Sequence, residues 1–233
     1  MSKLPIELVF FGATSFREVA EIVRDINRIE PTYSMRAILD DNPELHGKTF
    51  EGTPVVGPLD AHEQFPDARF VMGIGSYKTR LLRHSIIARL GLGDDRYETL
   101  ISPGAKIFPT AHLGPGCIVH YGAVISADTI LEPFAQVLSN SMVGVANRLC
   151  RGALLASLVS TAGDVTVGHY AHIGAGSAIA DGLTIAAGSQ VALGSVVLRD
   201  VRLGGFVLGN PAQLVRVEEI DQSIIRLWEE RKL

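Results

Sequence analysis

The chain has 233 residues, which is enough for one large domain or two small ones. Its 21 basic and 25 acidic residues give a formal net charge of −4, and this balance argues against a protein whose main task is to bind nucleic acid. Hydrophobic residues make up 47% of the chain and charged residues 20%, so the chain can bury a core and is not disordered in bulk.

The sequence predicts neither a membrane segment nor a metal site. The apolar run near the N-terminus is too short for a signal peptide, and no stretch reaches the roughly 18 apolar residues of a membrane span. The two cysteines, Cys117 and Cys150, lie far apart without the spacing of metal ligands or of a disulfide scaffold. We therefore expect a soluble, cytoplasmic protein that binds no metal, membrane or nucleic acid.

The first hundred residues alternate predicted strands with predicted helices. In chain order these are a strand over 6–11, a helix over 16–29, strands over 34–40 and 68–75, and a helix over 80–91. This alternation predicts a small, Rossmann-like parallel sheet in an α/β domain. Ligands of such sheets bind beyond the carboxyl ends of the strands, which is where Gly12, Gly75 and the Asp40–Asp41 pair lie.

From residue 107 onward, an aliphatic residue recurs at every sixth position. Of the seventeen positions from Ile107 to Leu203, sixteen are aliphatic, and the exception is the β-branched Thr161. A period of six is too short for a helix-containing repeat, but it suits a short strand followed by a turn with small residues at the corner. The pattern predicts a solenoid whose coils stack at about 4.8 Å, the strand spacing of a sheet.

This run resembles the left-handed parallel β-helix of the hexapeptide acyltransferases, in which three hexapeptides make one triangular coil. On this resemblance the repeat forms between five and six coils. The motif order extends the resemblance over nearly the whole chain. It runs from GATSFREV through ILDDNPELHGKTFEGTPVVG, GIGS and the repeat to GNPAQLVR.

Taken together, these motifs resemble the bacterial nucleotide-sugar acyltransferase family that includes the sialic acid and bacillosamine-pathway acetyltransferases. The resemblance implies a homotrimer, with acetyl-CoA bound between neighbouring solenoids. It also implies a sugar-nucleotide-binding domain over residues 1–100 and a β-helix acyltransferase domain over 101–210. Residues 211–233 form a tail, which we expect to end in an amphipathic helix carrying Trp228.

The resemblance also assigns binding residues. Asp40 and Asp41 would contact the nucleoside, and the loops at Gly12, Thr14 and Gly75–Ser76 would lie near the phosphates and the sugar. The alternative is that these residues only form strand-to-helix turns. The first loop lacks the further glycines that this family usually carries there, so we expect its grip on the nucleotide to differ.

The family's catalytic histidine has no counterpart at the expected position. It would stand nine residues before the histidine of a V-H-I triplet, which here is His172, and that count reaches Gly163, followed by Asp164. We expect His172 to contact the acetyl carbonyl or the pantetheine of the coenzyme. As substitute catalytic residues we predict Asp164 and His169, with His120 as the weakest candidate.

The loss of the histidine favours one kind of acceptor. Acyl transfer from a thioester needs an unprotonated nucleophile, and an amine that titrates near pH ~8 supplies one without a base, whereas a hydroxyl does not. We therefore predict an acetyl-CoA-dependent N-acyltransferase that acts on a nucleotide-linked amino sugar for surface polysaccharide. Two alternatives stay open: a non-catalytic trimeric scaffold or ligand-sensing relative, and an O-acyltransferase that uses another base.

Overall fold

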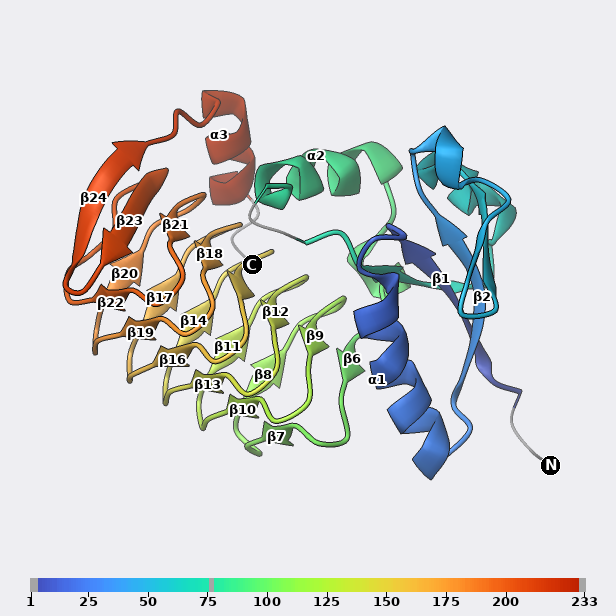
Figure 1. The fold of residues 1–233 in the computed structure, drawn as a ribbon, viewed down its shortest axis with the longest axis horizontal. Helices are drawn as coiled ribbons and strands as arrows, with labels where there is room; N and C mark the ends of the chain where they lie inside the picture. Colours follow the sequence, from blue (N-terminus) through green and yellow to red (C-terminus); the bar gives the residue numbers. More distant parts are fainter. Residues whose placement is uncertain (1–3, 76–77, 231–233) are drawn as a thin grey trace.

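The computed structural model describes residues 4–75 and 78–230. An α/β domain leads into a β-helix of short strands, and a hairpin and a helix follow at the far end (Figure 1). The predicted fold class is confirmed, whereas the division into three segments stays a prediction. Within the described residues, no helix combines the length and the apolar character needed to cross a bilayer.

The N-terminal sheet has five strands in the order β3-β4-β2-β1-β5. Their bounds are Ile6–Phe11 (β1), Tyr33–Leu39 (β2), Thr49–Phe50 (β3), Thr53–Gly57 (β4) and Arg69–Met72 (β5). Strand β1 pairs in parallel with β2 and β5, and β4 pairs in parallel with β2, as the predicted parallel sheet requires. The antiparallel hairpin of β3 and β4 was not predicted from the sequence.

Two helices cover the opposite faces of this sheet. Helix α1 (Phe16–Ile29) packs with Leu8 and Phe10 of β1, while α2 (Arg80–Leu90) packs with the alternate residues Val9 and Phe11. The alternation follows from the pleat, which turns successive side chains to opposite faces. Three short 3-10 helices complete the domain, at Pro43–Leu45 (η1), Leu59–Gln64 (η2) and Asp94–Arg96 (η3).

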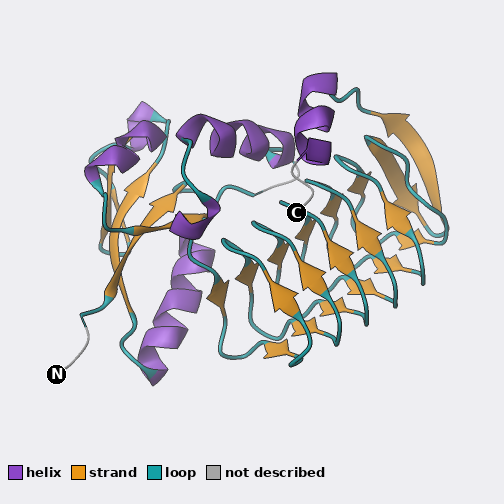
Figure 2. Ribbon diagram, turned by 180° about the vertical axis from the view of Figure 1, so that it is seen from behind, coloured by secondary structure: helices purple, strands orange, loops and turns teal. Residues whose placement is uncertain are grey.

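The β-helix is built from two-residue strands in three sheets, which stack in rows (Figure 2). The first face holds Leu100–Ile101 (β6), Ile118–Val119 (β9), Gln136–Val137 (β12), Leu154–Leu155 (β15), His172–Ile173 (β18) and Gln190–Val191 (β21). The second holds Lys106–Ile107 (β7), Val124–Ile125 (β10), Met142–Val143 (β13), Ser160–Thr161 (β16), Ala178–Ile179 (β19) and Val196–Val197 (β22). The third holds His112–Leu113 (β8), Ile130–Leu131 (β11), Arg148–Leu149 (β14), Thr166–Val167 (β17) and Thr184–Ile185 (β20).

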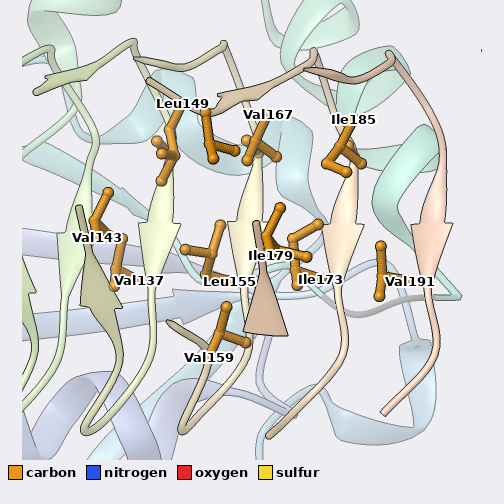
Figure 3. Packing of buried hydrophobic residues seen from close by; sticks show 14 of the residues in the cluster. Val137, Val143, Leu149, Leu155, Val159, Val167, Ile173, Ile179, Ile185 and Val191 are labelled. Carbon is orange, nitrogen blue, oxygen red and sulfur yellow. The ribbon is translucent and has the colours of Figure 1, made fainter. Parts of the chain in front are cut away.

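Paired strands of neighbouring coils lie eighteen residues apart, so three hexapeptides make one coil as predicted. Ile125 pairs with Val143, and Val143 pairs with Thr161, all in parallel. The second residue of each strand points inward, and from Val119 to Val197 these residues are buried. Figure 3 shows the aliphatic side chains meeting along the axis.

The end of the ladder differs from the prediction. Leu203, the expected last rung, is 41% exposed, and Val201 is buried in its place. Val201 bridges Ile185 only sixteen residues earlier in the chain, and Val207 then pairs with Val191 at the same spacing. The last coil is therefore two residues shorter than the others, so the strict period of six fails there.

Thr161, the exception in the ladder, belongs to a buried polar cluster. Its Oγ1 accepts hydrogen bonds from Asn147 Nδ2 at 2.6 Å and from the Gly144 N–H at 3.2 Å. Asn147 Oδ1 in turn accepts the Val165 N–H at 2.7 Å. The hydroxyl thus satisfies groups that an aliphatic side chain would leave without a partner.

The C-terminal segment closes the molecule with a hairpin and the expected helix. Strand β23 (Gly205–Gly209) extends the first face of the β-helix, and β24 (Ala212–Val217) folds back on it in antiparallel fashion. Helix α3 (Gln222–Glu230) then places the buried Trp228 against Tyr170 of the β-helix and against His84 of α2. The tail therefore fastens two parts of the chain to each other.

Candidate functional site

A cavity of about 320 Å³ lies beyond the carboxyl ends of β1, β2 and β5. It is lined by Gly12, Thr14, Asp40, Asp41 and Gly75, which were predicted as binding residues from strand-end position and resemblance. The structure thus brings these five residues together. The sixth predicted residue, Ser76, lies outside the described residues.

Asp40 shapes the wall of this cavity. Its Oδ2 accepts the Ala13 N–H at 2.8 Å, and its Oδ1 accepts the Asn42 N–H at 2.9 Å. Ser15 makes a further hydrogen bond in this loop. Its Oγ donates to the Gly73 carbonyl and so joins the loop after β1 to the end of β5. The carboxylate therefore positions the first loop besides bordering the cavity.

Asp41 is held as a carboxylate at the rim. Its Oδ1 accepts the Leu59 N–H at 3.0 Å, and its Oδ2 accepts a hydrogen bond from Arg89 Nη2 at 2.7 Å. Burial raises the pKa of Asp41, but the hydrogen bonds from Arg89 and Leu59 outweigh this effect and the pKa ends below its ordinary value. Asp41 is therefore ionised at neutral pH, and Arg89 balances its charge at the rim of the cavity.

The two glycines of the cavity are required by close packing. Gly12 has a φ of +93°, and a Cβ there would lie 2.6 Å from Ile74 Cγ1. A Cβ on Gly75 would lie 2.6 Å from Gln136 Oε1, a β12 side chain whose Nε2 donates to the Met72 carbonyl at 3.1 Å. At Gly75 the N-terminal domain therefore meets the β-helix directly.

His172 lies on the face of the β-helix that adjoins α2. It is the outward residue of β18, it is half-buried, and it is flanked in neighbouring coils by Leu154 and Gln190. Burial, together with the positive charges of Arg80 and Arg83, lowers the pKa of His172 to about 4. The imidazole is therefore neutral at physiological pH.

Gly163 and Asp164 form an edge of the β-helix after β16, where Gly163 is half-buried. Asp164 is exposed and has a left-handed φ of 57°, as a corner residue would. The Gly163 N–H donates to Asp181 Oδ1 at 3.1 Å. The sequence analysis missed Asp181, although its spacing of eighteen residues from Gly163 is one coil of the repeat.

His169 and His120 lie on different edges from Gly163. His169 follows β17, where its Nδ1 is 3.9 Å from Glu132 Oε2 and its ring stacks on Trp228 with a centroid separation of 6.0 Å. His120 follows β9 and lines a second cavity beside Glu18 of α1, and burial lowers its pKa although Glu18 raises it. The structure thus does not bring either histidine to Gly163.

One group of side chains within residues 4–75 and 78–230 has the composition of a metal site. Single ligand atoms of Glu132, Cys150 and His169 all lie within 4.8 Å of one another. Both oxygens of Glu132 already have cationic or N–H partners, since Oε1 is 2.5 Å from Arg148 Nη2 and Oε2 accepts the Arg151 N–H at 2.8 Å. The arginine beside it opposes a bound cation, so the group fits an ion-pair cluster better than a metal centre.

The sequence analysis also missed two buried arginines of α2. Arg80 donates to the Gly188 carbonyl at 3.3 Å and pairs with Glu218, while Arg83 donates to the Gly152 carbonyl. The positive charges of both lower the pKa of His172. An arginine on an amphipathic helix is ordinarily expected at the surface, so the residue type alone gave no signal.

The comparisons with known proteins agree with this geometry. No family model matches the chain. PerB from Caulobacter crescentus, solved in complex with CoA and GDP-perosamine, is 26% identical, with a TM-score of 0.78 over 92% of this chain and 99% of that one. The acetyltransferase domain of PglB from Neisseria gonorrhoeae is 25% identical, with a TM-score of 0.78 over 90% and 99%.

Along most of its length this chain is similar to hexapeptide-repeat sugar N-acetyltransferases. The resemblance given by the motifs is therefore confirmed, including the left-handed β-helix. A curated relative, the UDP-N-acetylbacillosamine N-acetyltransferase of Bacillus subtilis, is 29% identical over 105 residues, which are 42% of this chain and 45% of that protein. The chain spans less than half the length of the curated relatives that it matches.

Proposed function

We propose that this protein transfers an acetyl group from acetyl-CoA to the amino group of a nucleotide-linked amino sugar, in the cytoplasm and for bacterial surface glycan. The observation that carries the proposal is the match along 92% of the chain to a structure that holds CoA and GDP-perosamine. The cavity at the strand ends gives the sugar nucleotide a place in the N-terminal domain, in agreement with the general rule for parallel sheets.

In this proposal the N-terminal domain holds the acceptor. Asp40 and Asp41 accept hydrogen bonds from the nucleoside, and the backbone at Gly12, Thr14 and Gly75 borders the diphosphate and the sugar. The negative charge of Asp41 suits hydroxyl and N–H donors, because an ionised carboxylate is an acceptor only. These roles explain why two acidic residues stand beside a cavity for a charged ligand.

His172 serves the acetyl donor. A neutral imidazole has one N–H that can donate to the thioester carbonyl, and it adds no positive charge to the neighbourhood of Arg80. The thioester carbon accepts the lone pair of the amine, the carbonyl oxygen gains negative charge, and the coenzyme thiolate then leaves. Donors aimed at that oxygen stabilise the transition state.

Proton removal from the amine is the step for which this chain differs from its family. The amine attacks in its neutral form, and the ammonium that forms loses one proton after attack. Asp164 and His169 remain the predicted acceptors of that proton, although His169 lies on a different edge of the β-helix, against Glu132 and Trp228. Asp181 joins Asp164 as a carboxylate adjoining Gly163. Because the amine needs no base for attack, positioning supplies most of the rate in this scheme.

The functional unit in this proposal is a homotrimer with the coenzyme between neighbouring β-helices. The outward residues of the second face, from Val124 to Val196, are uncharged, and Met142, Ser160 and Ala178 among them are exposed. An uncharged face of short, flat strands suits contact with a second copy. Sedimentation equilibrium at the mass of three chains supports this assembly, and a single-chain mass contradicts it.

Gly163 favours a second candidate, a trimeric scaffold or ligand-sensing relative without catalysis. An assay that offers acetyl-CoA with UDP-, GDP- and dTDP-linked amino sugars separates the two, with thiol release as the readout. Matched acceptors that carry a hydroxyl in place of the amine test the O-acyltransferase alternative. Thiol release with an amino sugar alone is the expected result, and its absence with every acceptor from a folded trimer would contradict the enzyme.

A further inference from the structure

Arg83 is a buried cation whose hydrogen bonding is incomplete. Its side chain is 1% exposed and one N–H, at Nη2, donates to the Gly152 carbonyl. Its Nε and Nη1 are buried without a hydrogen-bond partner. Burial lowers the pKa of Arg83 to about 10, so the guanidinium is still charged at neutral pH.

Two other buried arginines of the described chain each have a carboxylate partner, so Arg83 is unusual among them in lacking one. Arg80 pairs with Glu218, and Arg151 makes two hydrogen bonds to Asp94, at 2.6 and 2.8 Å. In the part of the chain that the structure describes, no carboxylate stands within ion-pair distance of Arg83. A buried guanidinium without an anion is costly, so folded proteins usually pair it.

The position of Arg83 points to where the missing anion comes from. Its Nη1 lies just behind Gly75, because a Cβ built on that glycine would be 3.0 Å from Nη1. Gly75 lines the cavity at the strand ends, so the absence of a side chain there leaves the guanidinium next to the cavity wall. On its other side, the guanidinium carbon lies 5.7 Å from the centre of the Tyr170 ring, which holds it by a cation–π contact.

We propose that Arg83 is the anion-binding residue of this cavity and that its unpartnered N–H groups bind a diphosphate. A guanidinium is well suited to phosphate oxygens because it presents several fixed donors and keeps its charge when buried. The inference rests on the proposed function, which supplies diphosphate from two sources, the sugar nucleotide and CoA. The neighbouring Gln136 and Gly75 set the distance of approach to Nη1.

The proposal has a consequence for the free protein. Without a ligand, the unpaired charge lowers stability, so Arg83→Met should raise the melting temperature of the ligand-free protein. The same variant should lose the rise in melting temperature that a diphosphate ligand causes in the wild type. A merely structural arginine predicts the opposite sign for the first effect.

The test measures the binding of UDP, GDP, dTDP and CoA by calorimetry to wild type, Arg83→Met and Arg83→Lys. Arg83→Met should weaken one class of ligand at least about tenfold, as expected when a hydrogen bond to a charged group is lost, and Arg83→Lys should weaken it less. Loss confined to the nucleotides assigns Arg83 to the acceptor, and loss confined to CoA assigns it to the donor. Unchanged affinity for all four ligands overturns the proposal.

Arg151→Met is the matched control, because Arg151 is also buried but is paired with Asp94. It should lower the melting temperature and leave all four affinities unchanged. Turnover tests the proposed function separately. A wild type that binds diphosphate through Arg83 but releases no thiol would contradict the enzyme alone, whereas turnover with unchanged binding in Arg83→Met would contradict only the role of Arg83.

Discussion

The N-terminal domain and the β-helix place their chemical groups by different means. In the N-terminal domain each cavity residue occupies a loop that occurs once, such as the loop held by Asp40 and Ala13. In the β-helix before its shortened last coil, each residue has a counterpart eighteen positions away, so Gly163 is stacked on Asp181 and Thr161 on Val143. A functional departure in the β-helix can therefore be recognised against its own neighbours.

Because of this difference, candidate functional residues are recognised differently in the two regions: by their place at strand ends in the N-terminal domain, and by comparison with neighbouring coils in the β-helix. A residue that breaks the repeat can do so because it has a catalytic or binding role or because the local structure needs a polar group there. The hydrogen bonds of the residue identify the second case. Thr161 departs because its hydroxyl serves Asn147, which is a structural demand. No packing contact requires a glycine at Gly163, because a Cβ there would lie no closer than 3.6 Å to its nearest neighbour, so its link to catalysis stays a prediction.

The largest expected effect comes from Gly163→His, which places an imidazole at this edge. The glycine is not in the left-handed region, and a Cβ there meets Val145 O at 3.6 Å and Asp181 Oδ1 at 3.7 Å, both ordinary contacts. We expect thiol release with an amino-sugar acceptor to rise about 10²-fold, the lower end of the contribution of a general base. Gly163→Ala is the control, and equal rates for the two variants would show that this edge is remote from the acceptor.

Trp228→Ala tests whether the tail joins the two regions. The ring is 3% exposed, and its Nε1 donates to His84 Nδ1 at 3.3 Å. Truncation of a buried tryptophan costs roughly 3–5 kcal/mol, and here we expect it to appear as release of α3, seen as faster proteolysis of the tail. Trp228→Phe keeps the stacking on Tyr170 and should be milder. Proteolysis at the wild-type rate in both variants would contradict the role of the tail.

Thr161→Val restores an unbroken aliphatic ladder, yet we expect it to destabilise the β-helix. The change leaves Asn147 Nδ2 and the Gly144 N–H without their acceptor, at a cost of about 1–3 kcal/mol in the free energy of unfolding. Urea unfolding measures the difference. Thr161→Ser keeps the oxygen and should lose less, whereas a more stable valine variant would show that the hydroxyl is dispensable.

The smallest expected effect concerns the pH dependence of stability. The pKa of His172 is about 4 in the folded chain, against about 6.5 for an unperturbed histidine, so the unfolded chain binds the extra proton between these values. Stability should therefore fall as the pH falls from about 6.5 towards 4, and be full above that range.

His172→Gln should reduce this fall by about 1–2 kcal/mol in urea unfolding compared at about pH 5 and about pH 7. His120, whose pKa burial also lowers, should retain its own share of the pH dependence. An identical pH dependence in wild type and variant would mean that His172 is not desolvated in the folded state.

Most of the fold was accessible from the sequence because both halves obey simple periods. The strands and helices of the N-terminal domain and the sixfold repeat follow from hydrophobic spacing alone. The β3–β4 hairpin was not predicted: its two-residue turn has positive φ at both Glu51 and Gly52, and in the sequence only the glycine indicates such a turn. The burial of Val201 could not be predicted from the six-residue period. The last coil is shorter, so Val201 takes the inward place expected for Leu203.

The candidate site was accessible only in part. Strand ends located Gly12, Asp40 and Asp41, because the topology of a parallel sheet fixes where its loops meet. Arg83 was not accessible, because its significance lies in a partner that is missing after folding rather than in its residue type. Which of the predicted residues act in catalysis stays a prediction that the variants above test.

The hairpin of β23 and β24 has a consequence for self-association. A stack of parallel strands exposes unpaired N–H and C=O groups at its last rung, and such an edge is a template for pairing with another chain. Here β24 runs antiparallel to β23 and occupies that edge. At the opposite end of the same sheet, β6 lies against α1. Non-repeating elements therefore cover both ends of this stack of similar strands. They prevent the end-to-end pairing of molecules that could otherwise extend into fibrils.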